Sequence, residues 1–138
     1  MSNKIFFILF LGGCIAVIVH IFYFRNVELP REMTMQIEGK AYKLLTATTS
    51  EEWRVGLMNR ERLENADGMI FIFPTKQPRT FWNYNTHLNL DVYWMDGNNV
   101  VGKSRLPSID ETKNPKIVQS PKPVDRVVEL VRKSIKSR

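Results

Sequence analysis

Residues 68–74 read Gly-Met-Ile-Phe-Ile-Phe-Pro, and this stretch decides the fold class. A continuous apolar run of strand length that ends at a proline predicts a β-strand. On its N-terminal side, residues 33–47 alternate apolar and polar side chains around Glu38-Gly39-Lys40, which predicts a hairpin. On its C-terminal side, residues 79–82 predict a short strand. Residues 90–95 and 100–104 flank Asp96-Gly97-Asn98-Asn99, which predicts a second hairpin.

One helix stands out among these strands. Thr49 and Glu52 have the spacing of a capping box, so we expect a helix that begins there and ends near Asn59. The proline-containing residues 107–123 predict an extended loop. Residues 124–135 fit a helix by their spacing, and residues 126–130 also fit a strand, so both alternatives stay open. The predicted class is therefore α+β and β-rich, with a small mixed or antiparallel sheet or a barrel-like domain and one main helix.

The N-terminal residues predict a membrane anchor. Ile5 to Phe24 are twenty positions without a permanent charge, and such a helix is about 30 Å long, the thickness of a bilayer core. Leu11-Gly12-Gly13-Cys14 resembles a bacterial lipoprotein cleavage box, but the apolar run continues beyond Cys14, which favours an uncleaved transmembrane helix. We therefore expect an anchor over residues 1–25, a linker over 26–32 and a globular domain over 33–138. The single-pass protein is expected to hold this domain outside the cytoplasm.

Composition excludes several classes of site. One cysteine excludes a disulfide scaffold and a multi-cysteine metal site, and two histidines argue against a histidine-rich one, so we expect neither a metal nor a cofactor. The residues after 112 carry eight basic and two acidic side chains, which account for the whole net charge of +6. This basic C-terminal segment predicts contact with anionic lipid or an envelope polymer, with a solvated tail as the alternative. Nucleic acid is not an expected partner, because no binding motif accompanies the charge.

Three strings of sequence carry a family resemblance. They are Gly56-Leu57-Met58-Asn59-Arg60-Glu61-Arg62-Leu63, then Asp67-Gly68-Met69-Ile70-Phe71-Ile72-Phe73, then Phe81-Trp82-Asn83-Tyr84-Asn85-Thr86-His87-Leu88-Asn89-Leu90-Asp91-Val92. In this order and spacing they resemble the family called domain of unknown function 192, over about residues 34–131. The resemblance implies a small β-rich fold that is frequently exported or membrane-anchored in bacteria, and it implies no established activity. The chain departs from the family pattern at Asn83, Tyr84, His87 and Asn89, which make the third string more polar than usual.

The same third string supplies the candidate site. Asp91 begins a strand whose two faces are both largely apolar, so we expect a half-buried carboxylate that needs a partner. The candidate partners are Arg60, Asn85 and Thr86, and the alternative is an aspartate that only braces the preceding loop. Asparagines and Thr86 framed by Trp82 fit a site for a sugar or another small polar ligand, and they fit a structural loop equally well.

These observations predict a membrane-anchored extracytoplasmic binding or accessory domain. Its contact surface is expected around the loop from Trp82 to Asp91, with Arg60, Trp82, Asn85, Thr86 and Asp91 as binding candidates. The alternative is a small enzyme that uses Asp91 as its acid–base group, oriented by Arg60. The sequence contains no nucleophile elbow, P-loop or dinucleotide-binding turn, so it leaves enzyme activity open and favours the binding domain.

Overall fold

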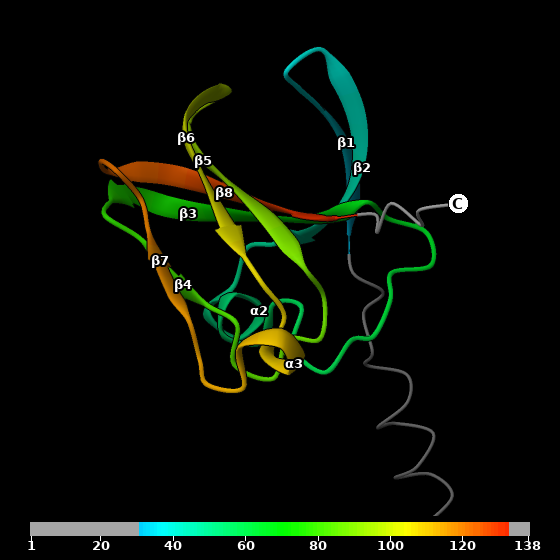
Figure 1. Ribbon diagram of the computed structural model, residues 1–138. Helices are drawn as coiled ribbons and strands as arrows, with labels where there is room; N and C mark the ends of the chain where they lie inside the picture. Colours follow the sequence, from blue (N-terminus) through cyan, green and yellow to red (C-terminus); the bar gives the residue numbers. More distant parts are fainter. Residues whose placement is uncertain (1–30, 133–138) are drawn as a thin grey trace, which may run out of the picture.

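The computed structural model describes residues 31–132, which build a six-stranded mixed sheet (Figure 1). The spatial order is β1-β2-β3-β8-β5-β6. The bounds are β1 Glu32–Ile37, β2 Lys40–Ala47, β3 Gly68–Gln77, β8 Val124–Val131, β5 Leu90–Asp96 and β6 Asn99–Leu106. Only the β2–β3 pair is parallel among these neighbours. The predicted β-rich α+β class is confirmed, and the sheet is open at β1 and β6 and not closed into a barrel.

Both predicted hairpins are present. Glu38 and Gly39 connect β1 to β2 with φ angles of 51° and 80°, and positive values at both turn positions match the twist of antiparallel strands. Gly97, at φ 56°, opens the turn from β5 to β6. In Figure 1 the two hairpins rise at opposite ends of the sheet, with β3 and β8 between them.

The predicted helix exists but is shorter than expected. α2 spans Ser50–Val55, and its capping box is complete: the Thr49 hydroxyl accepts from the Glu52 amide, and the Glu52 carboxylate accepts from the Thr49 amide at 2.8 Å. The prediction of an end near Asn59 is wrong because Gly56 takes φ 48° and ψ −127°, outside the helical region.

The prediction of an extended loop over residues 107–123 is wrong in part. Ser108 caps a one-turn helix, α3 (Ile109–Thr112), by accepting from the Glu111 amide. β7 (Ile117–Gln119) then pairs antiparallel with β4 (Thr80–Trp82) to form a separate two-stranded sheet. Figure 1 shows α2, α3, β4 and β7 together on one side of the large sheet.

Each face of the large sheet carries its own apolar cluster. Along β5, Leu90, Val92 and Trp94 belong to the main cluster, whereas Tyr93 and Met95 belong to the second, as the predicted alternation requires. The main cluster also takes residues from the α2 turn and from the strands that surround it: Leu45, Ala47, Leu57, Met69, Phe71, Phe73, Leu88, Leu106, Val124 and Val127. The side with the main cluster is therefore the side that the smaller elements cover.

The structure decides between a helix and a strand near the C-terminus, the alternative that the sequence left open. Val124–Val131 form a strand between β3 and β5, so part of the basic C-terminal segment lies inside the sheet. Among residues 31–132, no helix has the length and apolar character needed to cross a membrane. The predicted anchor over residues 1–25 and most of the predicted linker lie outside the described residues.

Candidate functional site

Glu129 is a carboxyl inside the core. It lies on β8, where the register places it beside Met69 of β3 and Val92 of β5. Because side chains alternate along a strand, it shares a face with Val127 and therefore points to the side of the main cluster. Only 4% of the residue is exposed.

Nothing in the described part of the chain compensates this burial. Within residues 31–132 no hydrogen bond or ion pair is formed by the Glu129 carboxyl, and the one fully enclosed side-chain nitrogen or oxygen without a partner is Arg79 Nε, so the Glu129 oxygens keep slight contact with solvent. Desolvation therefore raises the pKa of Glu129 from 4.5 to about 8, since the charged form loses its hydration and gains no partner. A buried polar group without a partner is costly and uncommon in folded proteins. Burial of Glu129 is thus unfavourable for the stability of the fold, and Glu129 is a candidate functional residue.

Glu129 lines a small cavity of about 30 Å³. Four aromatic residues line it, Trp53, Phe71, Phe81 and Trp82, together with Arg54, Val55, Gly56, Leu57, Met58 and Thr86. Three of these residues are open to solvent, with 37% of Val55, 50% of Trp82 and 68% of the Arg54 side chain exposed. The cavity therefore extends from a buried acid toward the surface between the end of α2 and β4.

Two glycines make this arrangement possible. A Cβ on Gly56 would meet the Phe71 ring at 3.1 Å, and its φ of 48° disfavours a side chain there. Gly56 thereby turns the chain so that Leu57 and Met58 reach the cavity. A Cβ on Gly68 would lie 1.9 Å from the Glu129 carbonyl oxygen, so only glycine lets β3 approach β8 at the level of the acid.

Backbone hydrogen bonds hold the loops around the cavity. The Asn59 amide donates to the Asn85 carbonyl at 2.8 Å, which joins the α2 turn to the third sequence string. The Ile109 amide donates to the Thr86 carbonyl at 2.9 Å, which joins that string to α3. Thr86 is itself 5% exposed, and its hydroxyl donates to the Tyr84 carbonyl at 3.2 Å.

Asn83 is a structural residue. It is fully buried, and its amide group donates to the Pro107 carbonyl and to the Thr112 hydroxyl, both at 2.8 Å, while its oxygen accepts from the Lys116 amide at 2.6 Å. All of its hydrogen-bonding groups are therefore directed to the protein. For this residue the structural interpretation of the polar loop is the correct one.

An exposed apolar rim lies beside the cavity mouth. Trp82 and Tyr84 stack with ring centroids 5.2 Å apart and remain 50% and 45% exposed. Ile117 faces Trp82 across the β4–β7 pair and is 59% exposed. Exposed apolar side chains scattered singly are ordinary, but a contiguous group beside a cavity indicates a contact surface.

The structure brings together only some of the residues that the sequence nominated. Trp82 and Thr86 line the cavity, and Asn85 supports it through its backbone. Asp91 forms its ion pair with Arg132, at 3.5 Å between Oδ1 and Nε, and lines a different hollow with Asp67 and Tyr93.

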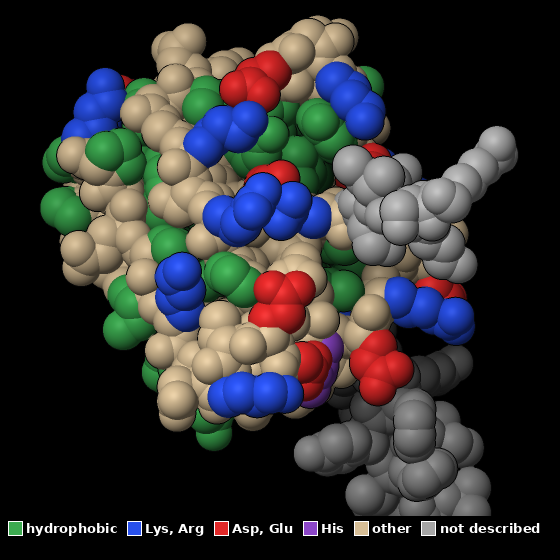
Figure 2. All heavy atoms as spheres, in the orientation of Figure 1, with side chains coloured by type: hydrophobic (Ala, Val, Ile, Leu, Met, Phe, Trp, Pro, Cys, Tyr) green, Lys and Arg blue, Asp and Glu red, His purple; other side chains and the backbone are tan. Residues whose placement is uncertain are grey.

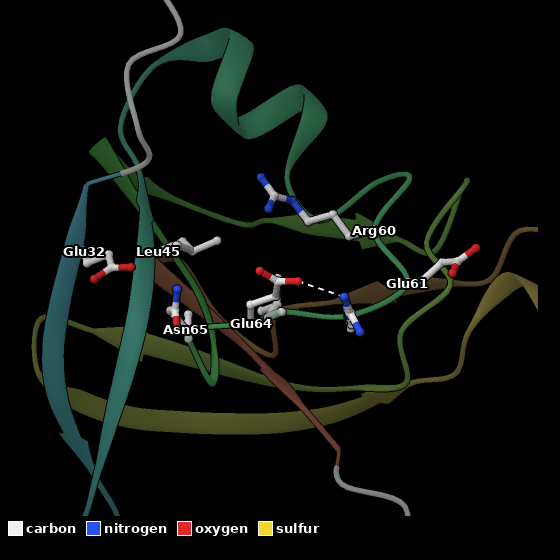
Figure 3. A pocket seen from close by; sticks show the side chains of 9 residues that line it. Glu32, Leu45, Arg60, Glu61, Glu64 and Asn65 are labelled. Atoms are coloured by element: carbon white, nitrogen blue, oxygen red, sulfur yellow. Dashed lines mark hydrogen bonds and ion pairs between the residues drawn. The ribbon is translucent and has the colours of Figure 1, made fainter.

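Arg60 lies elsewhere again. It lines an open hollow of about 1020 Å³ between β1–β2 and the loop over residues 60–66. Figure 3 shows Arg60 and Glu61 at one end of this hollow and Glu32, Leu45 and Asn65 at the other. The expected pairing of Arg60 with Asp91 is therefore not formed, because Arg132, at the end of β8, takes the place beside Asp91.

Sequence reasoning missed Glu129, which it counted among the charges of a basic tail. The available signal was a single acid in Val127-Val128-Glu129-Leu130-Val131, with two apolar residues on each side. Among residues 31–132, no three His, Cys, Asp or Glu side chains lie close enough together to hold a metal ion. We therefore consider Glu129 as a lone acid.

The three strings that carry the family resemblance meet at this cavity. The first string contributes Gly56 to Met58, the second Phe71, and the third Phe81, Trp82 and Thr86. Segments that are far apart in the sequence thus share one small volume around Glu129.

Comparison with known proteins agrees with this architecture. A protein from Sinorhizobium meliloti 1021, described provisionally as a transcription regulator, is 25% identical, with a TM-score of 0.58 over 74% of this chain and 79% of that chain. A protein of unknown function from Novosphingobium aromaticivorans DSM 12444 is 22% identical, with a TM-score of 0.60 over 77% of this chain and 83% of that chain. No curated protein matches the chain. The model of the DUF192 family, described as an uncharacterized ACR, matches residues 33–138, and the chain therefore belongs to the DUF192 family.

Proposed function

We propose that this chain is a membrane-tethered binding domain whose ligand site is the Glu129 cavity. The observation that carries the proposal is a carboxyl on a residue that is only 4% exposed, without a hydrogen-bond or ion-pair partner among residues 31–132, in the lining of a cavity that also borders exposed residues. A ligand that supplies the missing partner would remove the cost of burying this group. Binding sites commonly combine apolar walls with a few polar groups that fix orientation, and this cavity has that composition.

The apolar rim gives the ligand a second contact. A polar tip that enters the cavity would leave the rest of the ligand against Val55, Trp82 and the neighbouring Tyr84 and Ile117. The contact surface expected from the sequence, between Trp82 and Asp91, is thereby narrowed to Trp82, Tyr84 and Thr86 with residues of the α2 turn.

The membrane part of the proposal rests on sequence. The apolar run from Ile5 to Phe24 supports a single-pass tether, and an extracytoplasmic domain is proposed with it. Exposed Lys113, Lys116, Lys122 and Arg132 support an additional contact with anionic lipid. In Figure 2 basic side chains on the visible face are interspersed with acidic ones, which favours a weak, salt-sensitive contact.

A second candidate function is an enzyme in which Glu129 acts as the acid–base group. A carboxyl whose pKa lies at about 8 can hold or release a proton near neutral pH, as a general acid or base must. In this candidate Glu129 replaces the expected pair of Asp91 and Arg60. Nucleic-acid binding is not proposed, and the regulator description stays with the Sinorhizobium protein.

The test is ligand-dependent thermal stabilisation of the full chain in detergent micelles. Amines, alcohols, amides and sugars are added singly, because a compound that binds only the native state raises the melting temperature. We expect at least one class to raise it in the wild type and in the matched control Glu64→Gln, an exposed acid away from the cavity, and not in Glu129→Gln. Stabilisation that persists in Glu129→Gln, or none with any class, would contradict the proposal.

A further inference from the structure

The size of the cavity limits what can reach Glu129. A volume of about 30 Å³ holds two or three groups the size of a water molecule, since a single water needs about 10–15 Å³. A sugar ring, a guanidinium or a quaternary ammonium is larger than this and would stop at the rim. The group that enters must therefore be small, such as a hydroxyl, an amide nitrogen or a primary ammonium.

The polar groups of the wall select among these. Glu129 offers carboxyl oxygens, and the Thr86 hydroxyl, which donates to the Tyr84 carbonyl, retains lone pairs to accept. Two lining side chains with N–H donors, Trp53 and Arg54, already form hydrogen bonds with other partners. The Trp53 indole N–H donates to the Ala47 carbonyl at 3.1 Å, and the Arg54 guanidinium is paired with Glu51, at 3.0 Å from Nε. Once Glu129 has released its proton, acceptors face the cavity, and a group with only donors is their complement.

We propose that the group bound beside Glu129 is the primary ammonium of a small alkylamine. This inference rests on the proposed function and names the ligand class of the same site. An ammonium has three donors and no acceptor, and its charge forms a strong, charge-assisted hydrogen bond with a carboxylate. The aromatic residues around the cavity favour a cation further. The alkyl chain then leaves along Val55 and Trp82, which are exposed and apolar.

Binding is coupled to a proton. Near neutral pH the unliganded Glu129 holds a proton, so an entering ammonium forms the ion pair while that proton leaves the carboxyl for the buffer. The elements packed around Glu129 contribute Arg54 from α2 and otherwise uncharged side chains: Met69 and Phe71 from β3, Val92 from β5, Phe81 and Trp82 from β4, and Thr86. Because Glu129 is the acid that titrates here, affinity should rise about tenfold from pH 6 to 7 and about fivefold from pH 7 to 8.

The experiment measures binding by isothermal titration calorimetry on the full chain in detergent micelles. The probes are n-propylamine, the neutral 1-butanol of similar length, and tetramethylammonium, each at pH 6, 7 and 8. We expect n-propylamine to bind at least tenfold more tightly than the other two, with affinity rising across the pH series. Glu129→Gln should lose at least tenfold in affinity for n-propylamine, and the matched Glu64→Gln should not.

The outcomes separate this inference from the proposed function. If 1-butanol binds as tightly as n-propylamine and its binding depends on Glu129, the ligand group is neutral: the ammonium assignment is overturned and the binding site stands. Equal binding of tetramethylammonium overturns the size argument and with it the assignment. If no probe, nor any compound of the stabilisation panel, shows binding that depends on Glu129, the proposed function itself fails.

Discussion

At the scale of single residues, Glu129 and Asp91 show how the surroundings of a carboxyl determine its properties. Asp91 is partly exposed and lies beside Arg132, so its charge is hydrated and paired. Glu129 is one strand away on β8, faces the main apolar cluster and has neither advantage. Asp91 is a candidate from the sequence because it stands in a motif, whereas Glu129 is a candidate because it is buried in the structure.

Replacing Glu129 with Gln should stabilise the unliganded protein in a way that depends on pH. The pKa of a hydrated glutamate is 4.5, and that of Glu129 in the fold is about 8, so the native state holds a proton that the unfolded chain has released. The contribution of Glu129 to stability is therefore fully present below pH 4.5 and is lost as the pH rises through 8, whereas Gln does not titrate. We expect the advantage of Glu129→Gln to grow by on the order of 3 kcal/mol between pH 5 and 8.

Urea unfolding of both proteins at several pH values measures this difference. Glu64→Gln, which removes an exposed carboxylate, should show a pH dependence close to that of the wild type. Parallel stability curves for Glu129→Gln and the wild type would refute the raised pKa.

Asn83 should be needed for stability because it connects three segments. Asn83→Ala removes hydrogen bonds to Pro107, Thr112 and Lys116 and leaves partly buried backbone groups of Pro107 and Lys116 without these partners. We expect a loss of about 3 kcal/mol in the free energy of unfolding, since each net hydrogen bond contributes about 1 kcal/mol and an orphaned group costs more. The exposed Asn65→Ala is the control, and a similar urea midpoint for the two variants would show that the Asn83 network matters little.

At the scale of elements, the close approach of β3 and β8 depends on Gly68. A Cβ at this position would lie 1.9 Å from the Glu129 carbonyl oxygen, and backbone cannot move aside as a flexible side chain can. Gly68→Ala should therefore destabilise the protein by about 3 kcal/mol or more. It should also disturb the Glu129 cavity.

The control for this change is Gly97→Asn in the β5–β6 turn. Nothing lies within 4 Å of a Cβ there, and asparagine tolerates the φ of 56° better than most residues. Thermal unfolding should separate the two variants clearly. Equal melting temperatures would mean that β3 and β8 can part at Gly68 at little cost.

The elements differ in how far the sequence could predict them. Both hairpins and the α2 capping box depend on local chemistry, such as positive φ at Glu38 and Gly39 or the spacing of Thr49 and Glu52, and these predictions are confirmed. β7 could not be predicted from its own residues, because Ile117–Gln119 become a strand only by pairing with the distant β4. The site was predicted in part for a related reason: Trp82 and Thr86 stand in a motif, whereas burial of Glu129 follows only once β8 lies between β3 and β5.

At the scale of the whole molecule, the large sheet and the smaller elements packed on it each contribute part of the cavity wall. The large sheet supplies Glu129 and Phe71, and the smaller elements α2 and β4 cover that face. Gly56, where the chain turns out of α2, lines the same cavity as the acid. A rigid sheet thus places the carboxyl, while short elements set the width of the opening.

The chain as a whole should stay in the membrane through residues 5–24. Each arginine placed at the centre of a membrane span costs about 2.5–3.5 kcal/mol, so Ile15→Arg together with Ile18→Arg should release the full chain from bacterial membranes. The wild type, and the control Val27→Arg outside the apolar run, should remain in the membrane fraction after an alkaline carbonate wash. Cys14→Ala should also remain, because the tether is predicted to be a helix and not a lipid on the cysteine. Mass spectrometry of the extracted protein should find the residues before Cys14 retained, whereas a mature chain that begins at Cys14 and carries a diacylglycerol would establish the lipoprotein alternative.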